Sequence, residues 1–196
     1  MKKNINLGIL TGISYVTGLD YYKGINEHYM NSSEPVYSIN PNPSMLFSSV
    51  DCDKYVKLLE EGDFNKVSDH LMAGISKLVN AGCNYLAIAS NTGHIAYQSV
   101  KEKYPELNII HIADCIASEL KKKSYYDVGL IGTKPTMEQN YLIKRLKLHS
   151  INTTVPDSEK DRIKIYDIIC NELSYNIFKD GSKKSIIQII EKLMKD

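Results

Sequence analysis

The stretch Tyr85-Leu86-Ala87-Ile88-Ala89-Ser90-Asn91-Thr92-Gly93-His94 decides the fold. Its first five residues form a continuous apolar run of strand length, which is typical of a central parallel strand covered on both faces. The run stops at small polar residues, and a helix is expected to follow as far as about Lys103. This order of strand, polar turn and helix predicts an open α/β sheet, in which ligands bind at the carboxyl ends of the strands.

Strands and helices alternate along the rest of the chain, so the pattern predicts a mostly parallel, doubly wound sheet with helices on both faces. The strands are predicted at Asn6–Leu10, Val36–Ile39, Met45–Val50, Asn108–Ile112, Asp127–Ile131 and Asn152–Val155. The helices are predicted at Gly18–Met30, Cys52–Glu60, Phe64–Ala81 with the N-cap Asp63, Ala113–Lys122, Met137–His149, Ser158–Ser174 and Ser182–Lys195.

Two segments of the chain resemble each other. Gly8-Ile9-Leu10-Thr11-Gly12 leads through Ser14 into a helix, and Gly129-Leu130-Ile131-Gly132-Thr133 leads through Thr136 into another. Each segment opens with a strand and a Gly/Thr turn, followed by a hydroxyl residue at a helix N-terminus. The repeat is short enough to arise by chance.

Taken as a true duplication, the repeat predicts two similar α/β domains, at residues 1–112 and 113–196, with the site in the cleft between them. In the second domain the strand that matches Tyr85–Ala89 should follow the helix Ser182–Lys195, and the sequence contains no such strand. The second domain is therefore expected to lack its last strand.

Composition narrows the classes of function. The 196 residues carry a net charge of +1, which gives no global field for nucleic acid or for an anionic membrane. No stretch approaches the roughly 18–20 apolar residues of a membrane span. The charged start Met1-Lys2-Lys3-Asn4 precedes an apolar run too short for a signal peptide. We therefore expect a cytoplasmic protein with no nucleic-acid or membrane partner.

The four cysteines form no CxxC pair, so a zinc site is not expected, and a cytoplasmic location disfavours disulfides. The simplest interpretation is that all four are small apolar residues of the interior. The four are Cys52, Cys83, Cys115 and Cys170.

Three strand ends carry small polar residues where a helix begins: Thr11-Gly12-Ile13-Ser14, Ser90-Asn91-Thr92, and Gly132-Thr133 with Thr136. Free backbone N–H groups at a helix N-terminus, beside hydroxyl and amide side chains, can hold an anion. Three such turns facing one cleft would suit a ligand with two carboxylates. The alternative is that Ser14, Ser90 and Thr133 are only N-caps.

The sequence lacks the motifs that are typical of nucleotide binding and of serine hydrolases. The turns contain no GxGxxG and no GxxxxGK[ST], which disfavours nucleotide binding. No GxSxG elbow surrounds Ser90, so that serine is not a hydrolase nucleophile on this pattern. His94 lies one turn into its helix, where it could act as a base, orient the turn or serve a structural role.

The motifs resemble those of the aspartate/glutamate racemase family over nearly the whole chain. The matching segments follow the family's order: Gly8–Ser14 with Asp20-Tyr21-Tyr22, Ser49-Val50-Asp51, Gly62-Asp63-Phe64, Ser90–His94, His111–Asp114, Gly129–Gln139, Val155-Pro156-Asp157 and Glu172-Leu173. The resemblance implies two pseudo-symmetric α/β domains, a homodimer, and racemisation of an amino acid without PLP or metal. The resemblance implies the mechanism of that family, in which one thiolate removes the Cα proton and a second thiol returns a proton on the opposite face.

The sequence departs from the family pattern at both thiols. Ser90 stands where the first catalytic cysteine is usual, and the Gly-Cys-Thr-Glu motif of the second is absent. Cys115 and Cys170 do not match that motif. The resemblance therefore implies Ser90 as the residue at the catalytic position. The expected contacts for an amino-acid or dicarboxylate ligand are Gly12, Ser14, Asn91, Thr92, Thr133 and Lys179, with Lys183 as the alternative to Lys179.

Two functions follow as alternatives. The first is a cofactor-independent racemase of the aspartate/glutamate type, with proton abstraction and return at Cα. The second is a non-catalytic binding protein for a dicarboxylate or amino acid, or an inactive remnant, because both thiols are missing.

Overall fold

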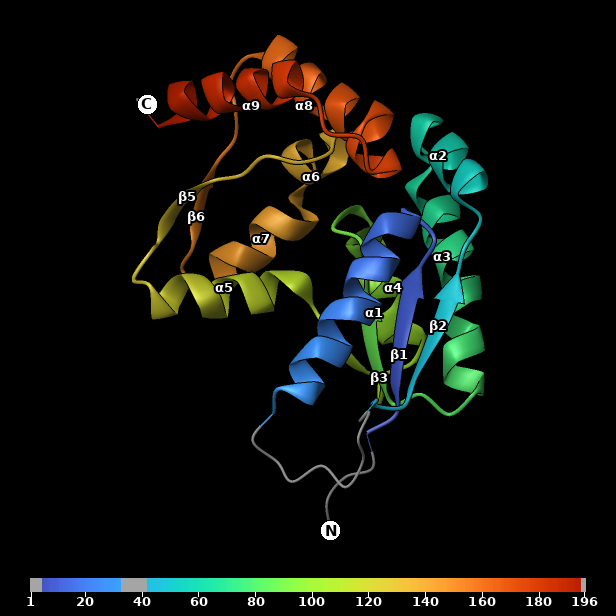
Figure 1. The fold of residues 1–196 in the computed structure, drawn as a ribbon. Helices are drawn as coiled ribbons and strands as arrows, with labels where there is room; N and C mark the ends of the chain where they lie inside the picture. Colours follow the sequence, from blue (N-terminus) through green and yellow to red (C-terminus); the bar gives the residue numbers. More distant parts are fainter. Residues whose placement is uncertain (1–4, 33–41, 195–196) are drawn as a thin grey trace. The chain divides into compact units, whose positions relative to one another are not determined.

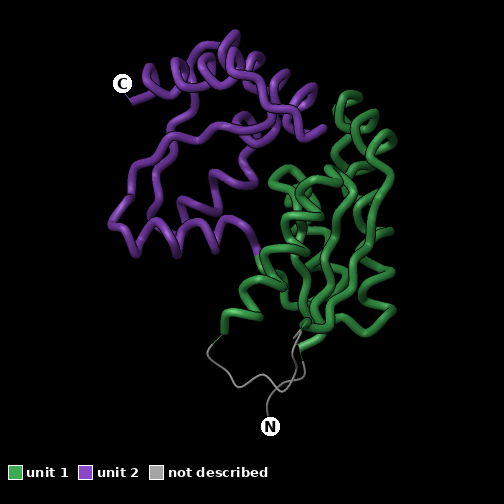
Figure 2. The backbone as a smooth tube through the Cα atoms, in the orientation of Figure 1, with its two compact units in different colours: residues 1–110 green, residues 111–196 purple. Residues whose placement is uncertain are grey.

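The computed structural model describes residues 5–32 and 42–194. The chain forms two compact units, unit 1 at residues 1–110 and unit 2 at residues 111–196 (Figure 2). The strand predicted at Val36–Ile39 and the charged start at residues 1–4 lie outside the described residues.

Unit 1 is built on a parallel sheet. Its described residues contribute four strands in the order β2-β1-β3-β4, and Figure 1 shows β1 between β2 and β3. The strands are β1 (Leu7–Thr11), β2 (Met45–Ser49), β3 (Tyr85–Ile88) and β4 (Asn108–Ile110). Leu10 pairs with Ile88 and Thr11 pairs with Ser49, so β1 lies between β2 and β3. The predicted α/β class with a parallel sheet is confirmed.

Helices cover both faces of this sheet. On one face, Ile9 and Ala87 are buried against Tyr21 and Ile25 of α1 (Tyr15–Met30). On the other face, Leu10, Leu86 and Ile88 pack in a larger core cluster with the apolar side of α3 (Phe64–Asn80). Neighbouring strand residues point to opposite faces, so a run of apolar residues is buried from both sides.

The remaining helices of unit 1 are α2 (Cys52–Glu60), α4 (Tyr97–Lys103) and the short 3₁₀ helix η1 (Thr92–Ala96). The predicted cap Asp63 accepts a hydrogen bond from the Lys66 amide at 3.1 Å, and Asp51 caps α2 in the same way. The strand predicted to reach Ile112 ends at Ile110, because His111 caps the next helix through its Nδ1 atom.

Unit 2 contains a smaller parallel sheet. The described residues give it two strands, β5 (Asp127–Gly129) and β6 (Asn152–Thr154). Around them lie α5 (Ile112–Lys122), α6 (Lys134–Glu138), α7 (Asn140–Leu148), α8 (Glu159–Asn171), the 3₁₀ helix η2 (Leu173–Tyr175) and α9 (Asp180–Leu193).

The single helix predicted at Met137–His149 is two helices in the structure. Gln139 has ψ 151°, an extended conformation, and it separates α6 from α7. Side chains of unit 2 form two core clusters, one centred on α5 and α7 and the other on Met137, Ile165 and Ile189. No described helix has both the length and the apolar character needed to cross a membrane.

Candidate functional site

Two of the predicted turns contact each other at the carboxyl edge of the unit 1 sheet. We call Gly12-Ile13-Ser14 the β1 turn and Ser90-Asn91-Thr92 the β3 turn. The Ala89 amide donates to the Leu10 carbonyl at 2.9 Å, so the segments that follow β1 and β3 leave the sheet side by side. A Cβ placed on Gly93 would lie 3.0 Å from Ile13 Cδ1 and 3.4 Å from Ser90 Cβ. The fold therefore brings these two predicted turns together.

Thr17, which was not among the predicted site residues, links the two turns. Its hydroxyl donates to the Ala89 carbonyl at 2.8 Å and also lies 3.0 Å from the Ser14 carbonyl. The first turn of α1 is thereby attached to the end of β3. This role depends on β1 and β3 being neighbours, so the local sequence around Thr17 gives no signal for it.

The β1 turn requires glycine at its first position. Gly12 has φ +94°, and a Cβ there would lie 2.4 Å from the Val50 carbonyl oxygen. Ser14 precedes α1 in an extended conformation, but its side chain makes no capping hydrogen bond. The interpretation of Ser14 as a side-chain N-cap is therefore wrong, and its hydroxyl is not committed to the amides of α1.

The β3 turn is held by its own hydrogen bonds. The Ser90 hydroxyl accepts from the Gly93 amide at 3.2 Å. The Ser90 carbonyl accepts from Nδ1 of His94, a side chain that is 1% exposed, at 2.8 Å. His94 thus fixes the turn from inside. Asn91 is exposed to solvent and Thr92 is buried.

A third turn, which follows β2, joins the same edge. The thiol of Cys52, the first residue of α2, donates to the Ile13 carbonyl at 3.1 Å. Cys52 was predicted to be a small apolar residue of the interior, but it is only partly buried. Its position directly after the cap Asp51, at the end of a predicted strand, was the available signal. Cys83 is different, because it is buried in the core and burial raises the pKa of its thiol.

The predicted residues of unit 2 have partners of their own. The Thr133 hydroxyl accepts from the Thr136 amide at 3.4 Å and lies 2.9 Å from the Thr136 hydroxyl, so Thr133 acts as an N-cap. Lys179 has a side chain 61% exposed and lies 3.5 Å from Glu172. Cys115 is exposed and Cys170 is partly exposed, so the prediction that all four cysteines lie in the interior is wrong for Cys115.

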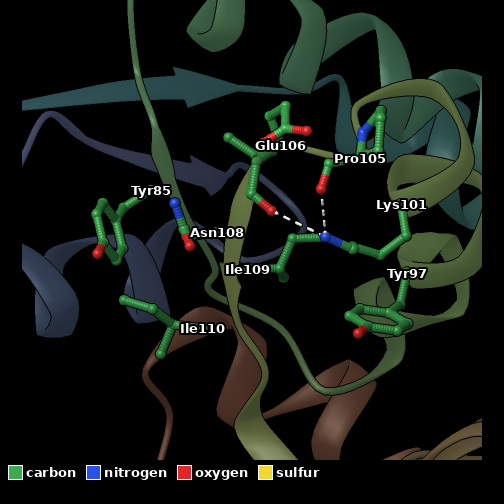
Figure 3. Close-up of a pocket in the computed structure, with 9 residues that line it drawn as sticks. Tyr85, Tyr97, Lys101, Pro105, Glu106, Asn108, Ile109 and Ile110 are labelled. Atoms are coloured by element: carbon green, nitrogen blue, oxygen red, sulfur yellow. Dashed lines mark hydrogen bonds between the residues drawn. The ribbon is translucent and has the colours of Figure 1, made fainter.

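A pocket of about 480 Å³ lies elsewhere in unit 1, beside β4 and α4 (Figure 3). Lys101 lies at its wall and donates to the carbonyls of Pro105 and Leu107. None of the predicted site residues lines this pocket. Among the described residues, no group of three or more His, Cys, Asp and Glu side chains is placed to hold a metal ion.

Comparison with known proteins identifies the family of this chain. The model of the Asp/Glu/hydantoin racemase family matches residues 10–196. The chain belongs to that family. Two solved structures with the same arrangement support the assignment. They are a proposed Asp/Glu racemase from Yersinia pestis and an aspartate racemase homologue from Pyrococcus horikoshii OT3.

The Yersinia structure shares 28% sequence identity with a TM-score of 0.81, over 98% of this chain and 81% of that one. The Pyrococcus structure shares 26% identity with a TM-score of 0.74, over 96% of this chain and 79% of that one. A glutamate racemase from Campylobacter jejuni, 15% identical over 93% of this chain and 65% of that one, shares the fold with a TM-score of 0.56. The resemblance of the sequence motifs to the aspartate/glutamate racemase family is therefore confirmed.

Proposed function

We propose that the chain is a cofactor-independent amino-acid racemase of the aspartate/glutamate type, with its ligand-binding turns at the carboxyl edge of the unit 1 sheet. The observation that carries the proposal is the meeting of the β1 and β3 turns, held by Thr17 and His94. Ligands of parallel α/β sheets bind at this edge, and amides and hydroxyls there suit a carboxylate.

Within unit 1 we assign the ligand carboxylate to Gly12, Ser14, Asn91 and Thr92. Gly12 lets the backbone turn sharply beside Val50, and Ser14 keeps its hydroxyl free of a capping bond. Asn91 is the exposed member and is expected to make the side-chain contact. Thr92 is buried, so we expect its contribution to come from the start of η1.

Ser90 suits the donation of a proton better than its removal. Its oxygen already accepts from the Gly93 amide, which leaves the hydroxyl hydrogen to point at a ligand. A serine hydroxyl is a much weaker acid than a thiol, whose ordinary pKa is about 8.5. We therefore expect slow exchange at Cα in the natural chain: hydroxide from the solvent removes the proton to form water, and the Ser90 hydroxyl stabilises the carbanion until water returns a proton.

The family assignment supports the coarser features of the proposal. We propose that the substrate is a small acidic amino acid, that neither PLP nor metal takes part, and that the protein is a cytoplasmic homodimer. Thr133 and Lys179 stay predicted ligand contacts of unit 2.

The experiment is proton exchange in deuterium oxide. The purified chain is incubated with L- and D-aspartate and with L- and D-glutamate, and deuterium at Cα is followed by NMR. Ser90→Cys is expected to raise the rate by about 100-fold, the lower range of general acid–base catalysis, and Ser90→Ala to lower it. The matched control Cys83→Ser changes a thiol outside the turns and should leave the rate unchanged if the variant folds.

The same samples test the alternative function. The weak acidity of Ser90 favours a binding protein that turns nothing over. Calorimetry with aspartate, glutamate and succinate that shows binding, together with no exchange in the natural chain or in Ser90→Cys, would replace the racemase proposal by this one. An absence of both binding and exchange would refute both.

A further inference from the structure

We propose that the pocket beside β4 is a second ligand site of unit 1, which binds an α-amino acid with an apolar side chain, free or acylated on its nitrogen. The residues that line this pocket do not belong to the β1 or β3 turn, so the ligand is separate from the racemase substrate. Three features of the molecule support the site: an open part of the β4 backbone, a fixed lysine, and apolar walls.

The backbone of β4 has an open hydrogen-bonding pair at Ile109. The Asn108 amide donates to the Asn84 carbonyl beside β3, so the backbone of the next residue, Ile109, faces away from β3. The described residues place no strand on that side and give the Ile109 amide and carbonyl no hydrogen-bond partner. An α-amino acid can bond to both groups, as in an antiparallel pair: its nitrogen donates to the Ile109 carbonyl and its carboxylate accepts from the Ile109 amide.

The open edge suits one amino acid better than a long strand. Before Ile109, the Leu107 carbonyl already accepts a hydrogen bond from the Lys101 ammonium at 3.3 Å. After it, His111 forms the cap of α5. A long added strand would therefore gain only the Ile109 pair, and a single amino acid gains the same pair. The pocket volume of about 480 Å³ lies within the range of small-molecule sites.

Lys101 supplies a positive charge for the carboxylate. Its Nζ donates to the Pro105 carbonyl at 2.7 Å and to the Leu107 carbonyl at 3.3 Å, which fixes the ammonium beside the edge. An ammonium has three donors, so one is left for a ligand. Because Leu107 and Ile109 are neighbours on this edge, the Lys101 ammonium and the Ile109 amide can bind the same carboxylate. Glu106 also lines the pocket, but it is exposed, so solvent screens its charge.

The walls of the pocket carry apolar surface from both faces of the sheet. Figure 3 shows Tyr85 and Ile110 on one side of β4, and Tyr97 and Lys101 of α4 on the other. Ile110 is 43% exposed, so its apolar surface is available to a ligand side chain. Covering apolar surface stabilises a complex, whereas a charged side chain placed there would lose hydration. The pocket therefore favours a branched or aromatic amino acid over an acidic one.

The probe is N-acetyl-L-leucine, and L-leucine tests the free amino acid. Amide NMR spectra of the chain are recorded with each compound at up to about 10 mM, which detects a weak site. We expect the amides of residues 107–110 to shift and those of residues 90–92 to stay unchanged. Shifts with both compounds show that either form binds, and shifts with one compound assign the site to that form. N-acetyl-L-leucinamide lacks the carboxylate and should bind about tenfold more weakly.

Matched lysine variants identify the charge that binds the carboxylate. Lys101→Met keeps the aliphatic stem, removes the ammonium and should weaken the binding of N-acetyl-L-leucine by about tenfold. Lys101→Arg keeps the charge and should restore most of the affinity. Lys103→Met is the control, because Lys103 lies on the same helix outside the pocket.

A backbone variant tests the other half of the contact. Ile109→Pro removes the open amide at an edge position, where a sheet tolerates proline, and it should also weaken binding by about tenfold. The same NMR spectra verify that each variant is folded, so this variant keeps the test decisive if Lys101→Met disturbs the turn at Pro105.

Unshifted amides at residues 107–110 with both compounds would overturn the proposal. Equal binding of N-acetyl-L-leucinamide would do the same, because the site would then not recognise a carboxylate. Shifts confined to residues 90–92 would assign the ligand to the racemase site instead. An Ile109 amide protected from hydrogen exchange in a dimeric sample without ligand would show that a second copy occupies the edge. None of these measurements uses catalysis, so each of these failures leaves the racemase proposal standing.

Discussion

Unit 1 and unit 2 use the same sequence of strand, Gly/Thr turn and helix, yet they bury it to different degrees. Ile9 and Leu10 of β1 are completely buried, whereas Leu130 and Ile131, their counterparts after alignment, are only partly buried. β1 has a neighbouring strand on each side, β2 and β3, whereas the described residues give β5 one neighbour, β6. A parallel strand with a neighbour on each side lies deeper under the helices that cover its two faces, so both faces are better buried.

The largest expected effect comes from a matched pair of core substitutions. Ile75→Ala removes a side chain that is 0% exposed and should lower the free energy of unfolding of unit 1 by about 4 kcal/mol. Its counterpart is Ile190, because Ile75 lies three residues before Leu78, which contacts Gly8, and Ile190 lies three residues before Leu193, which contacts Gly129. Ile190 is only partly buried, so Ile190→Ala should cost about 1–2 kcal/mol in unit 2. Hydrogen exchange resolved for each unit measures both values. Equal costs would show that unit 2 is as tightly packed as unit 1.

The next effect tests the β1 turn. Gly12→Ala combines a φ of +94° with a Cβ 2.4 Å from the Val50 oxygen, and should cost about 3 kcal/mol. Gly82→Ala is its control, because Gly82 has φ +88° but no atom within 4 Å of the added Cβ, so about 1 kcal/mol is expected. Urea unfolding followed by a unit 1 probe measures the difference. A similar loss at both positions would mean that φ alone, rather than contact with the β2 end, determines the cost.

The features that the sequence predicted are those with local causes. The β3 strand followed from an apolar run buried on both faces, and Asp63 from the short-range geometry of a cap. The break at Gln139 was missed because no glycine or proline marks it. The roles of Thr17 and Cys52 were missed because they depend on which strands are neighbours, and the order of strands is a property of the folded sheet.

A smaller effect concerns the polar contacts that hold unit 2. Asp114 of α5 accepts two hydrogen bonds from Arg145 of α7, at 2.7 and 2.8 Å, and one from His149 at 2.8 Å. The hydrogen bonds from Arg145 lower the pKa of Asp114 most, and the hydrogen bond from His149 lowers it further, so that it falls from 3.8 to about 2. Because the folded pKa is depressed, the stabilisation is present above pH 3.8 and is lost as the pH falls through about 2.

The side chain of Asp114 is 35% exposed, so solvent screening reduces this contribution to about 1 kcal/mol. Asp114→Asn should therefore destabilise unit 2 at pH 6 and remove this part of its acid sensitivity. Thermal unfolding of the natural chain and of the variant at pH 6 and pH 3 provides the measurement. An unchanged pH dependence in the variant would assign the acid sensitivity to other groups.

The smallest expected change in stability is at Lys179. Its ammonium lies 3.5 Å from Glu172 and its side chain is 61% exposed, so Lys179→Ala should alter the stability of unit 2 by less than about 0.5 kcal/mol. Because the substitution hardly changes the stability of unit 2, a loss of affinity can be assigned to the loss of the predicted ligand contact. If Lys179 binds a carboxylate, aspartate affinity measured by calorimetry should fall by about tenfold, a loss of about 1.4 kcal/mol. The exposed Lys184, on the first turns of α9, is the control. Equal affinities in the natural chain, Lys179→Ala and Lys184→Ala would remove Lys179 from the site and leave it as the exposed partner of Glu172.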